Sequence, residues 1–99
     1  MRYHFKIFWT VEDVEHIEAH GVQPWEVGEV LAGDFYARFK RRYDKRSLEK
    51  REFWDILGET RSGRVLFISI EFMPDGMERV SIARDAAEKE KSLYRRMIK

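Results

Sequence analysis

The chain has 99 residues, of which 43% are hydrophobic and 14% aromatic, and its formal net charge at pH 7 is +1. This length fits a single domain over residues 1–99 with one modest core, and the composition argues against disorder. The absence of cysteine excludes disulfides, thiolate nucleophiles and cysteine-based zinc sites.

The first third of the chain predicts a strand followed by two helices. Aromatic residues alternate loosely over residues 3–9, which favours a first strand. Thr10 suits a helix N-cap with Asp13 three residues later, and Gly21 suits the end of that helix. Pro24 favours the first turn of a second helix. We expect the inward face of this second helix to be Trp25, Val27, Val30 and Leu31.

The remaining two thirds predict a meander and a last helix. The basic stretch 34–52 is interpreted as an irregular strand followed by a long loop, and residues 53–72 as a hairpin with a Ser-Gly turn. A Pro-Asp-Gly turn then leads to a strand over 78–84, and Asp85 is the expected N-cap of the final helix. The inner face of that helix is predicted to be Ala86, Leu93, Tyr94 and Met97. The predicted fold is α+β, with an antiparallel sheet of about four strands, two N-terminal helices and a C-terminal helix.

Charge is distributed unevenly along the sequence. Residues 11–33 carry six acidic side chains and no Lys or Arg, whereas residues 34–51 carry eight cations and three acids. Such a domain can offer its basic part to a polyanion although its net charge is small, and the alternative is an ordinary solvated surface.

Arginines near strand ends are the strongest candidates for chemistry. His16 and His20 have the i, i+4 spacing of metal ligands, but no third ligand follows at a known spacing, so we expect exposed histidines and no metal. No glycine-rich loop precedes a helix, so no nucleotide cofactor is expected. Arg64 and Arg84 flank the predicted strands, and guanidinium groups bind phosphate bidentately. We expect both arginines to point into one shallow basic concavity, although they could instead pair with nearby acids.

Glu90 stands in an otherwise apolar stripe of the last helix, one turn from Tyr94. A carboxylate in such a stripe needs a cation, and Arg84 is the nearest in sequence. Glu90 would either orient its partner or act as a general acid or base.

Three motifs together resemble the BrnT-like toxins of the broader RelE-like ribonuclease group. Phe8 and Trp9 precede a helix that ends in His20, Gly21 and Val22, similar to the family's W and K-H-G-V. The segment "LGETRSGRVLFISI" resembles the hairpin G-x-T-x-x-G-R-x-L-x-V, and "SIARDAAEKEKSLY" resembles the ending S-A-R-x-A-x-x-x-E-x-x-x-Y.

The resemblance implies a RelE-like domain that acts as a metal-independent RNA endonuclease toxin of a type II toxin-antitoxin pair. A cognate antitoxin that also binds DNA would hold it inactive. The implied catalytic residues are Arg64, Arg84, His20, Glu90 and Tyr94. The basic residues expected to bind RNA are Arg38, Lys40, Arg41, Arg42 and Arg51.

The chain departs from the family pattern at three positions. Ala19 replaces a lysine, Ile82 replaces a serine, and Phe53 falls where the family has an arginine that Arg51 could replace. The loss of these hydrogen-bond donors from a metal-free site predicts weaker catalysis. Two alternatives therefore remain open: a non-catalytic module that binds RNA or a protein through the same basic face, and a pure protein-interaction domain.

Because the first residues lack a signal-peptide pattern and no apolar run is long enough to span a bilayer, we expect a cytoplasmic protein without membrane attachment.

Overall fold

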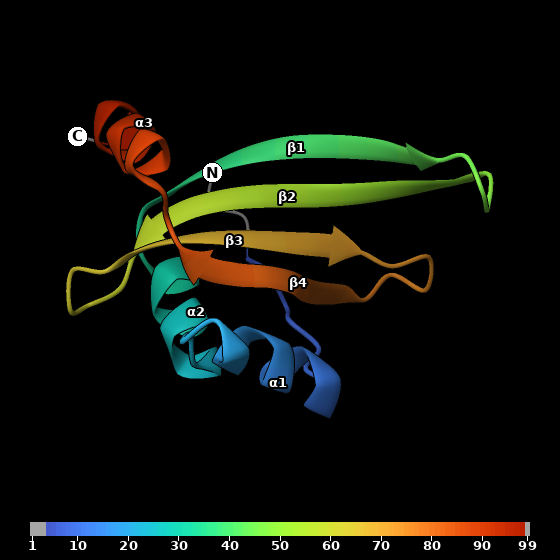
Figure 1. Cartoon of the computed structure of the whole chain (residues 1–99), viewed down its shortest axis with the longest axis horizontal. Helices are drawn as coiled ribbons and strands as arrows, with labels where there is room; N and C mark the ends of the chain where they lie inside the picture. The colour runs from blue at the N-terminus through green and yellow to red at the C-terminus, as the bar shows by residue number, and fades with distance from the viewer. Residues whose placement is uncertain (1–3, 99) are drawn as a thin grey trace.

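The computed structural model describes residues 4–98, which form a four-stranded antiparallel sheet with helices on both of its faces (Figure 1). Helices α1 (Val11–Ala19) and α2 (Pro24–Ala32) come first. Strands β1 (Phe35–Asp44), β2 (Glu49–Glu59), β3 (Val65–Phe72) and β4 (Glu78–Asp85) follow, and helix α3 (Glu88–Ile98) comes last. The strands are adjacent in chain order, so the sheet is a simple meander. The predicted α+β class and element order are confirmed.

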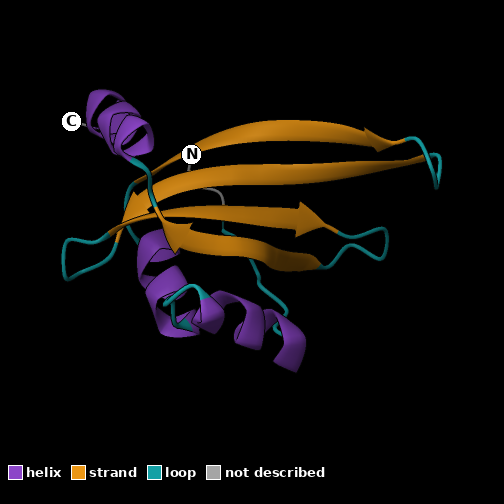
Figure 2. Ribbon diagram, in the orientation of Figure 1, coloured by secondary structure: helices purple, strands orange, loops and turns teal. Residues whose placement is uncertain are grey.

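Two layers of different character cover the sheet (Figure 2). Helices α1 and α2 lie on one side, which we call the helix-packed face. Helix α3 lies on the other side and only at the end where β1 begins and β2 ends. Because successive strand residues point to opposite faces, each strand contributes to both layers.

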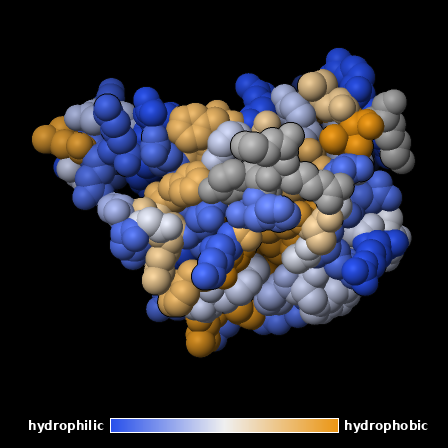
Figure 3. Space-filling view, turned by 180° about the vertical axis from the view of Figure 1, so that it is seen from behind, coloured by the Kyte–Doolittle hydropathy of each residue, from blue (hydrophilic) through white to orange (hydrophobic). Residues whose placement is uncertain are grey.

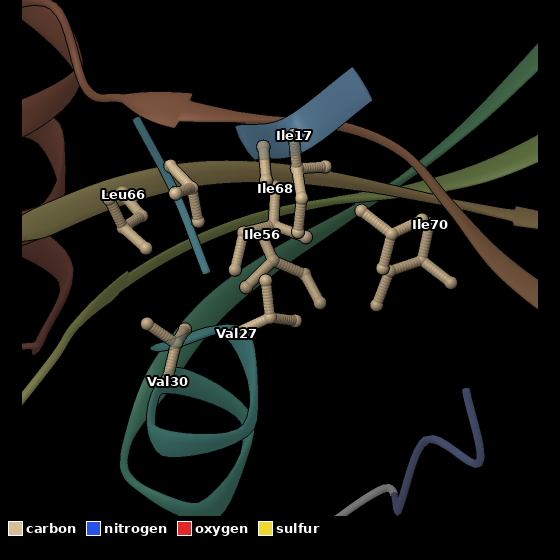
Figure 4. Packing of buried hydrophobic residues seen from close by; sticks show 10 residues of the cluster. Ile17, Val27, Val30, Ile56, Leu66, Ile68 and Ile70 are labelled. Carbon is tan, nitrogen blue, oxygen red and sulfur yellow. The ribbon is translucent and has the colours of Figure 1, made fainter. Parts of the chain in front are cut away.

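The main core lies between the helix-packed face and the first two helices (Figure 4). Ile17 of α1 and Val27 and Val30 of α2 meet the inner strands, and all three are essentially inaccessible to solvent. The strand side chains of this core include Ile56, Leu66, Ile68, Ile70, Val80 and Ala83. Alternate apolar residues in the middle of β2 and along β3 are buried here, which fixes the register of both strands.

Local signals account for both ends of α1. The Thr10 hydroxyl accepts the Asp13 N–H at 3.0 Å, as an N-cap does. Gly21 has φ +76°, the left-handed conformation that ends a helix without steric cost in glycine. Both predictions are confirmed.

The sequence predicts a first strand over residues 3–9, but the described residues 4–9 do not form one, so this prediction is wrong. Residue 3 lies outside the described residues. Within this segment one parallel bridge joins Ile7 to Glu78, and the Phe8 N–H donates to the Glu78 carbonyl at 2.8 Å. Phe5, Ile7 and Trp9 pack onto the core instead. The alternation therefore reflects packing of an extended segment across the start of β4, without a continuous ladder.

The basic stretch 34–52 is more regular than its sequence suggests. Its predicted strand is confirmed as β1, but the predicted long loop is wrong, because four residues turn the chain into β2 at Glu49. The β1–β2 hairpin extends beyond β3, since pairing between β2 and β3 begins only at Glu52. This projecting end has a mainly hydrophilic surface (Figure 3).

Two details of the predicted helices are wrong. Trp25 is 64% exposed, and Met97 is also exposed, because the sheet contacts a narrower stripe of each helix than the sequence pattern suggests. Asp85 does not cap α3, since it ends β4 and its carboxylate accepts a bond from Arg64. Glu90 caps instead, accepting the Ala87 N–H at 2.7 Å.

Gly58 lies where α2 crosses β2, and its missing side chain allows this close approach. A Cβ built there would overlap Val30 Cγ1 and approach Phe35 Cβ to 3.2 Å. We expect Gly58→Ala to reduce the free energy of unfolding by about 1–3 kcal/mol, the usual cost of overpacking a core. Urea denaturation would measure the change.

Gly28→Ala is the matched control, because a Cβ at this helical position meets no atom within 4 Å. It should leave stability unchanged or raise it by up to about 1 kcal/mol. Equal unfolding midpoints for Gly58→Ala and the wild type would contradict the packing described here.

Candidate functional site

The sheet face opposite α1 and α2 carries polar, aromatic and cationic side chains, and we call it the open face. Register and burial assign to it Tyr36, Arg38, Lys40, Arg42, Arg51, Phe53, Asp55, Leu57, Phe67, Ser69, Glu71, Ile82 and Arg84. Helix α3 adds Glu90 and Leu93 at one end. Four of the five predicted RNA-binding cations, all except Arg41, lie on this face.

Two hollows indent the open face and share their boundary. The first, which we call the helix hollow, lies between α3 and the sheet and is lined by Tyr36, Arg38, Lys40, Asp55, Leu57, Phe67, Glu90 and Leu93. The second, the strand hollow, continues across the sheet and is lined by Lys40, Arg42, Phe53, Asp55, Phe67, Ser69, Ser81, Ile82, Arg84 and Glu90. Four residues line both hollows, so they form one continuous depression. Its walls contain four cations and two carboxylates among the described residues.

A β-bulge directs Arg84 onto the open face. Ile70 pairs with Val80 while Ser69 pairs with Ile82, so Ser81 is an extra residue in β4. Without it, strict alternation from the buried Val80 would place residue 84 on the helix-packed face. A bulge reverses the alternation beyond it, so Ala83 enters the core and Arg84 points to the open face.

Arg84 and Glu90 form a bidentate ion pair between β4 and α3. The two guanidinium nitrogens donate to Oε1 at 2.8 Å and to Oε2 at 3.1 Å, and the guanidinium lies 4.4 Å from the Phe67 ring centroid. The predicted pairing is confirmed. The bond from Arg84 lowers the pKa of Glu90, and the Ala87 N–H acts in the same direction while burial opposes both. Glu90 is therefore ionised at neutral pH, a state that can accept a proton.

A second polar group spans the middle of the open face. The buried Ser69 hydroxyl donates to Asp55 Oδ1 at 2.9 Å, and Lys40 Nζ lies 3.4 Å from Asp55 Oδ2. Asp55 therefore stands at the boundary of the two hollows with one oxygen engaged by a hydroxyl and the other facing an ammonium group.

Arginine and aromatic groups lie against each other at the outer end of this face. The guanidinium carbons of Arg42 and Arg51 lie 5.7 and 5.3 Å from the Phe53 ring centroid. Arg51 also binds Glu71 through two bonds of 2.8 Å. Arg38 and Arg42 have no ion pair within residues 4–98, so both cations are available to an anionic ligand.

Arg64 lies on the opposite side of the sheet from Arg84, so the prediction of a shared concavity is wrong. Its Nε donates to Asp85 at 2.7 Å, and its NH1 donates to both oxygens of the buried Glu26 at 3.0 Å. These bonds tie α2 to the ends of β3 and β4. The Arg64 bond lowers the pKa of Asp85. The residue therefore has an evident structural role.

Of the other predicted site residues, His20 and Arg41 lie away from the open face, and Tyr94 is buried between α3 and the sheet. His20 is exposed at the C-terminal end of α1, where its ring lies 5.3 Å from that of His16. Tyr94 is only 4% exposed and packs with Leu57, Val65 and Ala86, and burial raises the pKa of its hydroxyl. Arg41 points to the helix-packed face, because it alternates with Arg42, and binds Glu52 there.

Sequence reasoning missed Tyr36, Asp55, Phe67 and Ser69 as parts of the depression. The signal was the two-residue period of the basic stretch, which places residues 36, 38, 40 and 42 on one face once β1 is continuous. Their partners on β2 and β3 follow from the hairpin register.

No group of three His, Cys, Asp or Glu side chains within residues 4–98 is arranged to hold a metal ion. None of the described helices has the length and apolarity needed to cross a membrane.

No protein-family model matches the chain, and no curated protein sequence is significantly similar to it. The family resemblance therefore rests on the short motifs alone.

The Arg84–Glu90 pair makes stability depend on pH. Glutamate has an ordinary pKa of 4.5, and the folded state lowers it. The carboxylate therefore stabilises the fold fully above about pH 4.5, and this contribution is lost as the pH falls through the lower folded pKa. We expect Glu90→Gln to destabilise the protein at neutral pH, by an amount that shrinks below about pH 4.5.

Urea denaturation of the wild type and Glu90→Gln across this range would measure the difference. Glu88→Gln is the control, because Glu88 is exposed and meets Lys91 only at 3.5 Å. A destabilisation by Glu90→Gln that is the same at pH 3 and pH 7 would contradict an ionised Glu90 in the folded protein.

Proposed function

We propose that the chain binds RNA across its open face and cleaves it there without a metal ion. The observation that supports this most directly is the continuous depression, whose walls combine Arg38, Arg42 and Arg84 with the half-buried aromatic side chains of Tyr36 and Phe67. Cations bind phosphates, and aromatic rings and guanidinium planes stack on unpaired bases, so this combination suits single-stranded RNA.

The length of the basic surface also supports a polymer as ligand. Arg38, Lys40 and Arg42 occur at every second position of β1, which spaces their α-carbons by about 7 Å. A row of cations at that interval can follow successive phosphates of an extended strand. Arg84 lies across the sheet and can contact a phosphate from the other side of the depression.

RNA can be cleaved by its own ribose 2′-hydroxyl. In the step we propose, the 2′ oxygen attacks the adjacent phosphorus as Glu90 accepts its proton. The bond from phosphorus to the 5′ oxygen breaks, and Lys40 donates a proton to that oxygen. The products are a 2′,3′-cyclic phosphate and a 5′-hydroxyl. Arg84 stabilises the extra negative charge on the phosphorus centre.

Binding without cleavage is the second candidate, and a specific observation favours it. Arg64 and His20 belong to the catalytic set implied by the family resemblance but lie away from Arg84 and Glu90. Tyr94, one helical turn from Glu90, is buried. Both Glu90 oxygens also accept bonds from Arg84, which makes the carboxylate a weaker base.

The resemblance further suggests the biological setting of a type II toxin neutralised by a protein antitoxin that binds DNA. We propose that such an antitoxin covers the open face with an acidic segment. Charge complementarity would make complex formation and RNA binding mutually exclusive.

Neighbouring arginines of β1 test the binding site, because Arg42 points to the open face and Arg41 to the other. We expect Arg42→Ala to weaken binding of a labelled single-stranded RNA and to lower the slope of log K against log salt by about 0.7. Fluorescence anisotropy in a salt series would measure both. Arg41→Ala is the matched control and should bind nearly as the wild type does. Equal losses in the two variants would argue against the open face.

The cleavage proposal is tested with a labelled RNA in EDTA. Wild type should yield a 2′,3′-cyclic phosphate end, and Glu90→Gln should reduce the rate by about 10²- to 10⁴-fold while retaining RNA binding. Arg64→Ala should still cleave if it is folded, since Arg64 lies on the other face. Binding without any wild-type cleavage would select the second candidate, and equal cleavage by wild type and Glu90→Gln would remove Glu90 from the mechanism.

A further inference from the structure

We propose that the helix hollow holds one unpaired nucleobase of the bound RNA and that Asp55 makes guanine the preferred base. This inference rests on the proposed RNA binding and assigns the hollow a role in sequence preference. It concerns the part of the depression under α3, where the walls differ in character from the cationic strand hollow.

Four of the eight residues that line the helix hollow are apolar or aromatic, which suits the face of a flat ring, and the other four are charged. Tyr36, Leu57 and Phe67 line it from three neighbouring strands, and Leu93 closes it from α3. Its volume is about 200 Å³. Nucleobases bind in such places because their faces are apolar and stack on aromatic rings, whereas a phosphate would be poorly solvated there.

The polar groups of the hollow define which base edge it can recognise. Asp55 lies at its boundary with the strand hollow, and the Asp55 side chain is 17% exposed, so the carboxylate is reachable from the hollow. Within the described residues, Ser69 occupies Oδ1 with a hydrogen bond, and Oδ2 faces only the Lys40 ammonium at 3.4 Å. A carboxylate has about four acceptor positions, so several remain for a ligand.

Guanine is the base whose Watson–Crick edge offers two adjacent donors to one carboxylate. Its N1–H and N2–H₂ point in the same direction, so each can reach an acceptor of Asp55. Adenine and cytosine place an acceptor nitrogen beside their amino group, and uracil has one N–H between two carbonyls. An acceptor atom turned toward a carboxylate is repelled and loses its hydrogen bond, so the carboxylate favours guanine over the other three bases.

The surroundings allow the base and the RNA backbone to bind together. Arg38 lies on the rim of the helix hollow, and Arg42 and Arg84 line the adjoining strand hollow. Phosphates next to the recognised nucleotide can therefore contact guanidinium groups while the base is inserted under α3.

Anisotropy with labelled nine-nucleotide RNAs tests this inference. The probes are an all-uridine strand and three strands with a single central G, A or C. We expect the G-containing RNA to bind wild type about tenfold more tightly than the other three. Asp55→Asn should abolish this preference and bind the four RNAs with equal affinity. Glu52→Gln, which removes a carboxylate from the helix-packed face, should keep the preference.

Each remaining outcome has a definite meaning. Equal binding of the four RNAs to wild type, or a G preference that survives in Asp55→Asn, would overturn the inference and leave the proposed RNA binding standing. Failure of wild type to bind any of them would overturn both. Should Asp55→Asn not fold, Leu93→Trp provides the second variant: filling the hollow should remove the G preference, and an intact preference would overturn the proposal.

Discussion

The alternation of side chains along the strands is the constraint on which the rest of this structure depends. Where β2 and β3 lie against α1 and α2, one set of alternate residues builds the core, so the other set must form the opposite face. The extra residue Ser81 reverses the alternation within β4 and places Ala83 in the core and Arg84 on the open face. Packing and a candidate site are thus two consequences of one register.

Helix α3 gives the open face its shape. Glu90 accepts bonds from both Arg84 and the Ala87 N–H, which fixes the first turn of the helix against the end of β4. Tyr94 then packs with Leu57 and Val65 one turn further along. Because these contacts cover only one end of the sheet, a hollow forms under the helix and the remaining cations stay accessible. The same two residues, Arg84 and Glu90, would therefore organise the face and take part in its proposed chemistry.

Local features were predictable from the sequence, and long-range ones were less so. The Thr10 cap and the Gly21 helix end depend on neighbouring residues only, and the β2–β3 hairpin has clear apolar periods, so all three were found. Whether Arg84 points to the same side of the sheet as Arg64 depends on the bulge in β4, which alternation alone does not show. Asp85 resembled a helix cap, but it forms an ion pair with Arg64, which directly precedes β3. The depression was missed because its residues come from four strands and a helix whose register had to be known first.

The most direct test of the account is to map which face of the sheet contacts RNA. A two-dimensional NMR titration with a short single-stranded RNA, following backbone amides and arginine Nε–H signals, would do this on the intact chain. RNA bound on the open face should shift the signals of Arg38, Arg42 and Arg84 together, while those of Arg41 and Arg64 stay in place. Shifts concentrated on Arg41, Arg64 and the residues of α1 and α2 would place the ligand on the opposite side and contradict binding on the open face.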